Sequence, residues 1–201
     1  MIRGMRSRLL FASLLLAPLV LAGSAAAQRT IEIRDRAQVR IETSVGAIVV
    51  ELDAARAPLT VQNFVQYAVE GHYEGTIFHR VAAAFIAQGG GFLPDMSEKP
   101  AEREVPNESG NGLSNVRGTI GMARGNEPHS GAAQFYFNLV DNGNSLDPRP
   151  SRWGYAVFGR VIEGLDVMDR IGSVPTGASG EFTRDVPVEP IVIERVVLLT
   201  E

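Results

Sequence analysis

Hydrophobic residues alternate with polar ones in some stretches of the chain, and in two other segments they recur every three to four residues. This pattern predicts a mainly β protein with two helices. Apolar and polar residues alternate over 38–43 and 47–52, on either side of a turn at 44–46, which indicates a β-hairpin. Further stretches rich in β-branched and aromatic residues predict strands at 77–81, 85–88, 118–122, 134–139, 156–161 and 191–199. Turn-rich segments separate these strands, and the longest of them, 89–117, is expected to run over the surface.

Two segments instead show the spacing of three to four residues that is typical of a helix. In the first, 58–69, Pro58 suits the first helical turn, and Gly71 suits the position just past the end. Its apolar face is expected to consist of Leu59, Val61, Phe64, Val65 and Ala68. The second helix is expected at 165–171. Many strands with only two helices favour a closed barrel, because closure removes exposed strand edges.

Residues 1–27 have the layout of a secretory signal. Three arginines precede an apolar run at 9–22, and small residues follow at 23–27. This layout predicts cleavage after Ala27 and a single folded domain over 28–201. A membrane anchor is less well supported, because the apolar run is shorter than the roughly 20 residues that span a bilayer.

Charge and cysteine content narrow the classes of partner and the location. The chain carries 19 basic and 23 acidic residues, and loss of 1–27 would remove three basic residues and leave a net charge of −7. An acidic chain argues against binding to nucleic acid, whose affinity depends on cationic contacts with phosphate. The chain contains no cysteine, so its fold must hold without disulfides after export. We expect a protein of the bacterial periplasm, or a secreted one, with no stable membrane span once the signal is removed.

Two sequence blocks carry the candidate chemistry. The first, FHRVAAAFIAQGGGF at 78–92, places Arg80 beside a short apolar run that ends in Gln88 and three glycines. The second, GTIGMARGNEPHSGAAQFYFNL, covers 118–139. A single cation beside an apolar run is typical of a groove that holds a peptide. The three histidines lack the spacing of metal ligands, and no predicted helix follows the glycines, so neither a metal nor a phosphate-bearing cofactor is expected.

Together with YAVFGRVIEGLDVMDRI at 155–171, these blocks resemble the cyclophilin family of peptidyl-prolyl cis–trans isomerases. The resemblance runs from about Val39 to Leu199, and the signal-bearing, single-domain layout is most similar to the periplasmic bacterial members. It implies a closed eight-stranded antiparallel β-barrel that is capped by two α-helices and carries a groove on its outer face. It also implies rotation of X-Pro bonds in exported, folding proteins, with proline-containing unfolded or extended chains as partners and no cofactor.

Rotation about a prolyl peptide bond needs no nucleophile or general base, since no covalent bond is broken. Its barrier is about 18–20 kcal/mol, because the nitrogen lone pair is delocalised into the carbonyl group. A site lowers this barrier if it binds the twisted amide better than either planar form. The twisted nitrogen is free to accept a hydrogen bond, which a fixed guanidinium can donate. Arg80 stands at the matching family position and is the candidate donor, whereas His79 should point to the opposite side of its strand and be structural.

The resemblance assigns further positions to substrate binding. These are Phe85, Ile86, Gln88, Ala123, Arg124, Gln134, Tyr136, Leu146 and Tyr155. Strand alternation places Gln134 and Tyr136 on one face and Phe135 and Phe137 on the other. Many members carry phenylalanine where Tyr136 stands, so its hydroxyl is expected to make the proline pocket wetter. At Arg124 the resemblance transfers only the backbone contact with an extended peptide, and little effect is expected from the side chain.

The segment 142–155 is the least typical of the family. Ser145 stands where several members carry tryptophan, the residue associated with cyclosporin binding, so we expect weak cyclosporin binding with isomerase activity intact. Trp153 lies in an apparent insertion and is placed to swing over the groove.

Two other functions remain open on the sequence alone. A non-catalytic chaperone module would bind proline-bearing segments in the same groove without useful turnover. A small-ligand barrel of the lipocalin kind would need a hollow interior, whereas the many Phe, Val and Ile residues at alternate strand positions favour a filled one.

Overall fold

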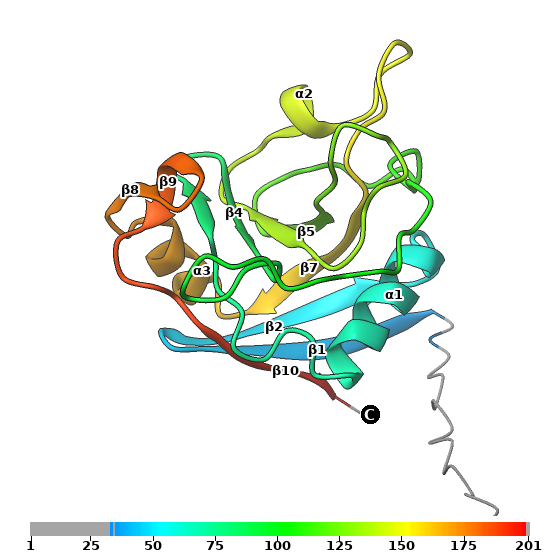
Figure 1. Cartoon of the computed structure of the whole chain (residues 1–201). Helices are drawn as coiled ribbons and strands as arrows, with labels where there is room; N and C mark the ends of the chain where they lie inside the picture. Colours follow the sequence, from blue (N-terminus) through cyan, green and yellow to red (C-terminus); the bar gives the residue numbers. More distant parts are fainter. Residues whose placement is uncertain (1–32, 34, 200–201) are drawn as a thin grey trace, which may run out of the picture.

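The computed structural model of the chain describes residue 33 and residues 35–199 (Figure 1). The predicted signal at 1–27 and its cleavage site lie outside the described residues. Within the described part of the chain, no helix has the length and apolar character needed to cross a membrane.

Eight strands form one antiparallel sheet in the order β10-β1-β2-β7-β5-β6-β4-β3. Their bounds are β1 (Arg36–Thr43), β2 (Gly46–Asp53), β3 (Arg80–Ala82), β4 (Ile86–Gly89), β5 (Thr119–Met122), β6 (Phe135–Asn138), β7 (Val157–Glu163) and β10 (Ile193–Leu199). The predicted hairpin is β1 and β2, with Thr43 opposite Gly46 at its turn. Figure 1 shows the sheet curling, with β1, β2 and β10 on one side and β4 and β5 on the other.

The two edge strands of this sheet, β3 and β10, do not pair with each other as a ladder. Instead, the segments that precede them meet at an isolated bridge between Ile77 and Val192. Phe78 donates its backbone N–H to the carbonyl of Ile191, and Ile193 donates to the carbonyl of Thr76, at 3.0 and 2.7 Å. The predicted barrel is therefore a curled eight-stranded sheet whose edges are joined only by these few bonds.

Both predicted helices are present as α1 (Pro58–Val69) and α3 (Leu165–Gly172). The prediction of two helices was incomplete, because a short third one, α2 (Gly143–Leu146), lies beside the later strands. A second, two-stranded sheet, β8 (Thr176–Ser179) with β9 (Phe182–Pro187), was also not predicted. It packs against β3 and so adds a wall beside the end of the main sheet.

Helix α1 has an unusual cap at its N-terminus. The residue before it, Ala57, offers no side-chain hydrogen bond. The carboxylate of Glu108, far along the chain, instead accepts the backbone N–H groups of Leu59 and Thr60 at 3.2 and 2.8 Å and the Thr60 hydroxyl at 2.7 Å. Leu59 is 49% exposed, so its expected place on the apolar face of the helix was wrong. An acid at this end also complements the helix dipole.

The interior of the sheet is filled by side chains. The rings of Phe64, Phe135 and Phe158 are fully buried, and the Phe64 centroid lies 5.5 and 5.3 Å from the other two. Tyr73 and Phe137 extend this aromatic core. A packed interior of this kind speaks against a ligand-binding barrel with a hollow centre.

Candidate active site

The candidate site is built on a row of residues that crosses four strands. Arg80 of β3 lies opposite Gln88 of β4, Gln88 lies opposite Tyr136 of β6, and Tyr136 lies opposite Gly121 of β5. Residues opposite each other on antiparallel strands share one face of a sheet. The alternate residue Phe135 lies on the opposite face, as strand alternation predicted, and belongs to the core, as the resemblance implied. The row therefore lies on the outer face.

A second hydrophobic cluster covers this outer face, separate from the core. Its buried members are Ile86, Ala123, Tyr136 and Leu146, with the half-buried Phe85 and Tyr155 packed against them. Together with Arg80, Gln88 and Arg124 these six residues line a pocket of about 280 Å³. The structure therefore brings nine of the ten predicted site residues to one pocket, from β3, β4, β6, α2 and the segments around 124 and 155.

The tenth predicted residue, Gln134, lies at the boundary of this pocket. Its Oε1 atom accepts a hydrogen bond from Nε2 of Gln88 at 2.9 Å. Gln134 lines a neighbouring cavity of about 430 Å³, which also shares Ala123 and Arg124 with the pocket. A Cβ atom at Gly91 would lie 2.5 Å from the Gln134 side chain, so this glycine is needed for close packing.

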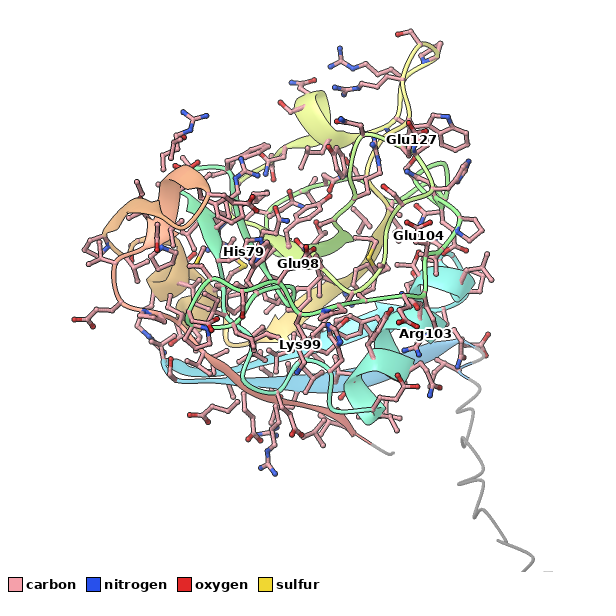
Figure 2. The ribbon with its side chains drawn as sticks, in the orientation of Figure 1. His79, Glu98, Lys99, Arg103, Glu104 and Glu127 are labelled. Atoms are coloured by element: carbon pink, nitrogen blue, oxygen red, sulfur yellow. The ribbon has the colours of Figure 1, made fainter. Side chains whose placement is uncertain are left out.

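Charged residues stand along the neighbouring cavity on the segment between β4 and β5. Glu98, Lys99 and Glu104 belong to its lining, and Figure 2 labels all three. Together with the first pocket, the cavity forms two adjoining hollows with Gln88 between them. An extended peptide that fills both would pass across this glutamine.

Arg80 lies at the edge of the pocket, on the short strand β3. Its side chain is 33% exposed, and its Nε atom lies 3.9 Å from Oδ2 of Asp185 in β9. Asp185 adopts a left-handed backbone conformation with φ of 67°, which is uncommon for a residue other than glycine. The unpredicted β8–β9 hairpin thus supplies the carboxylate that faces the candidate catalytic cation.

His79, next in sequence to Arg80, faces the other way, as expected for a structural residue (Figure 2). It is 1% exposed, and its ring lies 4.5 Å from that of Phe92 and 5.7 Å from that of Phe182. Burial, with the nearby charge of Arg80, lowers the pKa of His79 to about 4. The ring is therefore neutral at physiological pH and takes no part in the pocket.

The hydroxyl of Tyr136 does not make the pocket wetter, and that expectation was wrong. It donates a hydrogen bond to Oδ1 of Asn115 at 2.7 Å, and the residue is 2% exposed. Burial raises the pKa of Tyr136 well above its ordinary value. The ring fits only because Gly121 stands opposite, where a Cβ atom would lie 2.3 Å from the ring carbon Cζ. Tyr136 thus presents its ring to the pocket and its hydroxyl to the protein.

Arg124 has more of a role than the backbone contact that was expected of it. Its guanidinium lies 4.4 Å from the centre of the Tyr155 ring, within the range of a cation–π contact. It also donates hydrogen bonds to the carbonyls of Gly154 and Trp153 at 3.3 and 3.2 Å. The backbone N–H of Ala123 is already bonded to the carbonyl of Gln134 at 2.9 Å. Arg124 therefore braces the segment that carries Tyr155.

Trp153 does not fold over the groove. It is 49% exposed and packs edge-to-face against His129, with ring centres 5.1 Å apart. Trp153 lines neither the pocket nor the neighbouring cavity. Ser145 lies exposed on α2, beside the pocket residue Leu146.

Several residues that support the site were not predicted. Asn115, Asn138 and Asn142 are buried behind the pocket, and Gly121 and Asp185 contact its lining residues. Asn115 lies in the segment 89–117 that was interpreted as a surface excursion. In the described part of the chain, no three His, Asp or Glu side chains gather in a way that would hold a metal ion.

Comparison with known proteins gives a consistent result. Residues 38–198 match the family model described as "Cyclophilin type peptidyl-prolyl cis-trans isomerase/CLD". Over 163 residues the chain is 53% identical to peptidyl-prolyl cis-trans isomerase cyp18 of Streptomyces antibioticus, covering 80% of this chain and 98% of the relative. It is 48% identical to peptidyl-prolyl cis-trans isomerase B of Escherichia coli, covering 79% and 97%.

Solved structures agree with this result. A cyclophilin type peptidyl-prolyl cis-trans isomerase of Cryptosporidium parvum, crystallised in the presence of the dipeptide Ala-Pro, superposes with a TM-score of 0.68 at 26% identity. The match covers 82% of this chain and 99% of that one. With a family model that covers residues 38–198, relatives at 53% and 48% identity and a solved structure of the same fold, the chain belongs to the cyclophilin-type peptidyl-prolyl cis–trans isomerases.

Proposed function

We propose that Arg80 is the residue that accelerates rotation of X-Pro bonds, and that the pocket beside it holds the proline ring. The observation that carries this proposal is the row of Arg80, Gln88 and Tyr136 across three adjacent strands. It fixes the backbone of Arg80 beside the pocket floor, so that its side chain lines the pocket. The alternative, a module that only binds proline-bearing segments, uses the same pocket and differs in the role of Arg80.

Each wall of the pocket has a part in this mechanism. Phe85, Ile86, Tyr136 and Leu146 offer apolar surface to the proline ring and restrain it while the preceding carbonyl turns. Gln88 offers amide groups to the backbone of the bound peptide. The guanidinium of Arg80 donates to the prolyl nitrogen when the amide is twisted. A hydrogen bond to a charged group is worth about 1.5–3 kcal/mol, or roughly one to two decades of rate.

The rest of the acceleration comes from binding. A pocket that fixes the ring and an anchored flanking backbone restrict the bound peptide to conformations near the twisted form. The relative that was crystallised with Ala-Pro supports a small proline peptide as the minimal ligand.

The variant Arg80→Ala tests the proposal against the alternative. We expect isomerisation of a proline tetrapeptide by the chain without 1–27 to fall by about tenfold or more, whereas the dissociation constant of the peptide changes by less than about threefold. Arg184→Ala is the matched control, because it removes a neighbouring exposed arginine that also faces Asp185. Undiminished turnover in Arg80→Ala would show that another group is the donor.

We further propose that the protein acts on exported chains in the periplasm or outside the cell. The support is the signal-like layout of 1–27. Unfolded or extended proline-bearing chains are the proposed clients. Cell fractionation tests this proposal: the processed chain should be found with periplasmic or secreted proteins, and an unprocessed chain in the cytoplasm would contradict it.

We also propose weak binding of cyclosporin. The support is Ser145, which is exposed on α2 where several family members carry tryptophan. The proposal is tested with a substitution at this residue, described below.

A further inference from the structure

A network of buried amides lies behind the proline pocket and is centred on Asn115. This residue is fully buried, as is Asn138. Oδ1 of Asn115 accepts hydrogen bonds from the Tyr136 hydroxyl at 2.7 Å and from Nδ2 of Asn138 at 3.1 Å. Its Nδ2 atom donates to Oδ1 of Asp147 at 2.9 Å and to the carbonyl of Tyr155 at 3.3 Å. Every hydrogen-bonding group of this side chain therefore has a partner.

The backbone of Asn115 is held as firmly as its side chain. Its N–H donates to Oδ1 of Asp147 at 2.8 Å, and its carbonyl accepts the N–H of Asn142 at 2.7 Å. Asn142 in turn donates from Nδ2 to the carbonyl of Phe85 and to Oδ1 of Asn138, both at 2.8 Å. The network thus continues from Asn115 to the segment between β3 and β4.

The partners of this network stand at four of the walls that line the pocket. Tyr136 belongs to β6, Tyr155 precedes β7, and Phe85 precedes β4. Asp147 directly follows the pocket residue Leu146 at the end of α2. These walls come from four separate parts of the chain. Two backbone hydrogen bonds also join these parts in pairs, from the N–H of Tyr155 to the carbonyl of Leu146 and from the N–H of Leu139 to the carbonyl of Phe85, both at 2.9 Å. The bonds around Asn115 instead link all four parts.

We propose that Asn115 is a positioning residue for the isomerase reaction, which fixes the spacing of the proline pocket by joining three of its walls directly and the fourth through Asn142. Asn115 is not among the residues that line the pocket, so it would act on a bound proline ring only through its partners. The inference rests on the proposed role of the pocket as the site of the proline ring. A pocket binds a ring tightly only when the groups around it are already fixed, because loose side chains and loops must be ordered on binding, at a cost in affinity.

The charge of Asp147 strengthens this arrangement. Burial alone would raise its pKa, but hydrogen bonds from Ser114 and Asn115 outweigh burial and hold the pKa of this carboxyl below its usual value. The carboxylate is therefore ionised at neutral pH, and hydrogen bonds to it are charge-assisted. The end of α2, which carries Leu146, is therefore joined to Asn115 by charge-assisted hydrogen bonds to Asp147.

The test compares Asn115→Ala with the matched control Asn111→Ala. Asn111 lies in the same segment and also takes part in two hydrogen bonds: its Nδ2 donates to the carbonyl of Val157 at 2.9 Å, and its Oδ1 accepts from the N–H of Leu113 at 3.0 Å. It bonds to none of the pocket walls. Both variants should lose stability in thermal unfolding. Each is assayed well below its own melting temperature, so that the folded fraction is the same.

The readouts are the dissociation constant of the dipeptide Ala-Pro and the KM and kcat for a proline tetrapeptide, measured by NMR exchange. We expect Asn115→Ala to raise the dissociation constant and KM by about tenfold to a hundredfold, with kcat falling less. Tyr136→Phe removes only the hydrogen bond from the Tyr136 hydroxyl to Asn115, so it should raise KM by less than about fivefold. Asn111→Ala should leave the dissociation constant and KM within about twofold of the values for the parent chain.

If Asn115→Ala fails to fold, Asp147→Ala serves instead, since it cuts the tie to α2 from a half-buried position. It should raise KM and the dissociation constant in the same direction. The inference would be overturned if Asn115→Ala, or Asp147→Ala in its place, had the same dissociation constant and KM as the control Asn111→Ala. That outcome would leave the isomerase pocket in place. A parent chain that binds no Ala-Pro would instead contradict the proposed pocket, so the two failures are distinct.

Discussion

Nε of Arg80 lies 3.9 Å from Oδ2 of Asp185, and this long ion pair joins β3 to β9. The side chains are 33% and 23% exposed, so solvent weakens the attraction. The pair still holds the Nε side of the guanidinium toward the hairpin. Arg80 also lines the pocket, so this pair lies at the pocket edge.

The variant Asp185→Asn removes this charge and tolerates the left-handed backbone at 185, which asparagine adopts readily. We expect kcat/KM for a proline tetrapeptide to fall by up to about fivefold at low salt, because Arg80 loses a restraint worth up to about 1 kcal/mol. Added salt should reduce the difference. Asp169→Asn, which breaks the exposed pair with Arg117, is the control and should leave the rate unchanged. A faster Asp185→Asn enzyme would show that Asp185 holds the guanidinium back.

Gly121→Ala places a methyl group against the ring of Tyr136. Because the hydroxyl of Tyr136 is bonded to Asn115, the ring cannot move outward without losing that bond. We expect a loss of about 1–3 kcal/mol in the free energy of unfolding, measured with urea, and weaker peptide binding. The loss should be smaller in a Tyr136→Phe background, where the ring is free to shift. Gly110→Ala, which has open space around it, is the control, and equal losses at both glycines would contradict the packing argument.

His79 makes stability depend on pH. Its pKa is lowered to about 4 in the folded chain, against about 6.5 when unfolded, so the unfolded chain binds more protons between these values. The stabilisation is fully present above pH 6.5 and is lost as pH falls toward 4, with a total of about 3 kcal/mol. Half-buried His72, whose pKa is also lowered by burial, acts in the same direction.

The measurement is the free energy of unfolding between pH 4 and 7.5 for the parent chain and for His79→Leu, which keeps apolar contact with Phe92 and Phe182. We expect the leucine variant to show a flatter profile. His129→Leu changes an exposed histidine and should keep the slope of the parent chain. A slope that persists in His79→Leu would assign the pH dependence to other groups.

Cyclosporin binding should respond to Ser145→Trp. The parent chain is expected to bind weakly, and nanomolar inhibition of its isomerase activity would contradict this. The introduced indole lies beside Leu146 and supplies apolar surface at the pocket edge. We expect inhibition to become at least about tenfold tighter. Asn144→Trp, at the neighbouring exposed position of α2, should produce a smaller change.

The sequence allowed the site to be predicted where residues alternate on strands or lie in continuous blocks. The period of two placed Tyr136 and Phe135 on opposite faces, the resemblance assigned Tyr136 to the pocket and Phe135 to the core, and both positions agree with the structure. Helix α1 was recognisable from its apolar spacing and from Pro58 and Gly71 at its ends. These features depend on neighbours within a few positions, so they can be read locally.

The features that were missed depend on distant partners or on very short elements. Helix α2 has four residues, too few to show a helical period, and β8 is a strand of four mostly exposed residues, too short to show alternation. Asn115 reads as a surface asparagine in a turn-rich segment. Its burial follows from partners 21 to 40 positions away in the sequence. The position of the Tyr136 hydroxyl was mispredicted for the same reason.

Strand β10, at the end of the described chain, lies along the free edge of β1, with Gln38 opposite Leu199. The backbone of Ile191 and Ile193 also holds the segment that leads into β3 and its arginine. A polypeptide that is delivered N-terminus first therefore has an open β1 edge until residues 193–199 are released. The segment that leads into Arg80 gains its backbone partners only at the same late stage, so the edge of the pocket is completed after its floor.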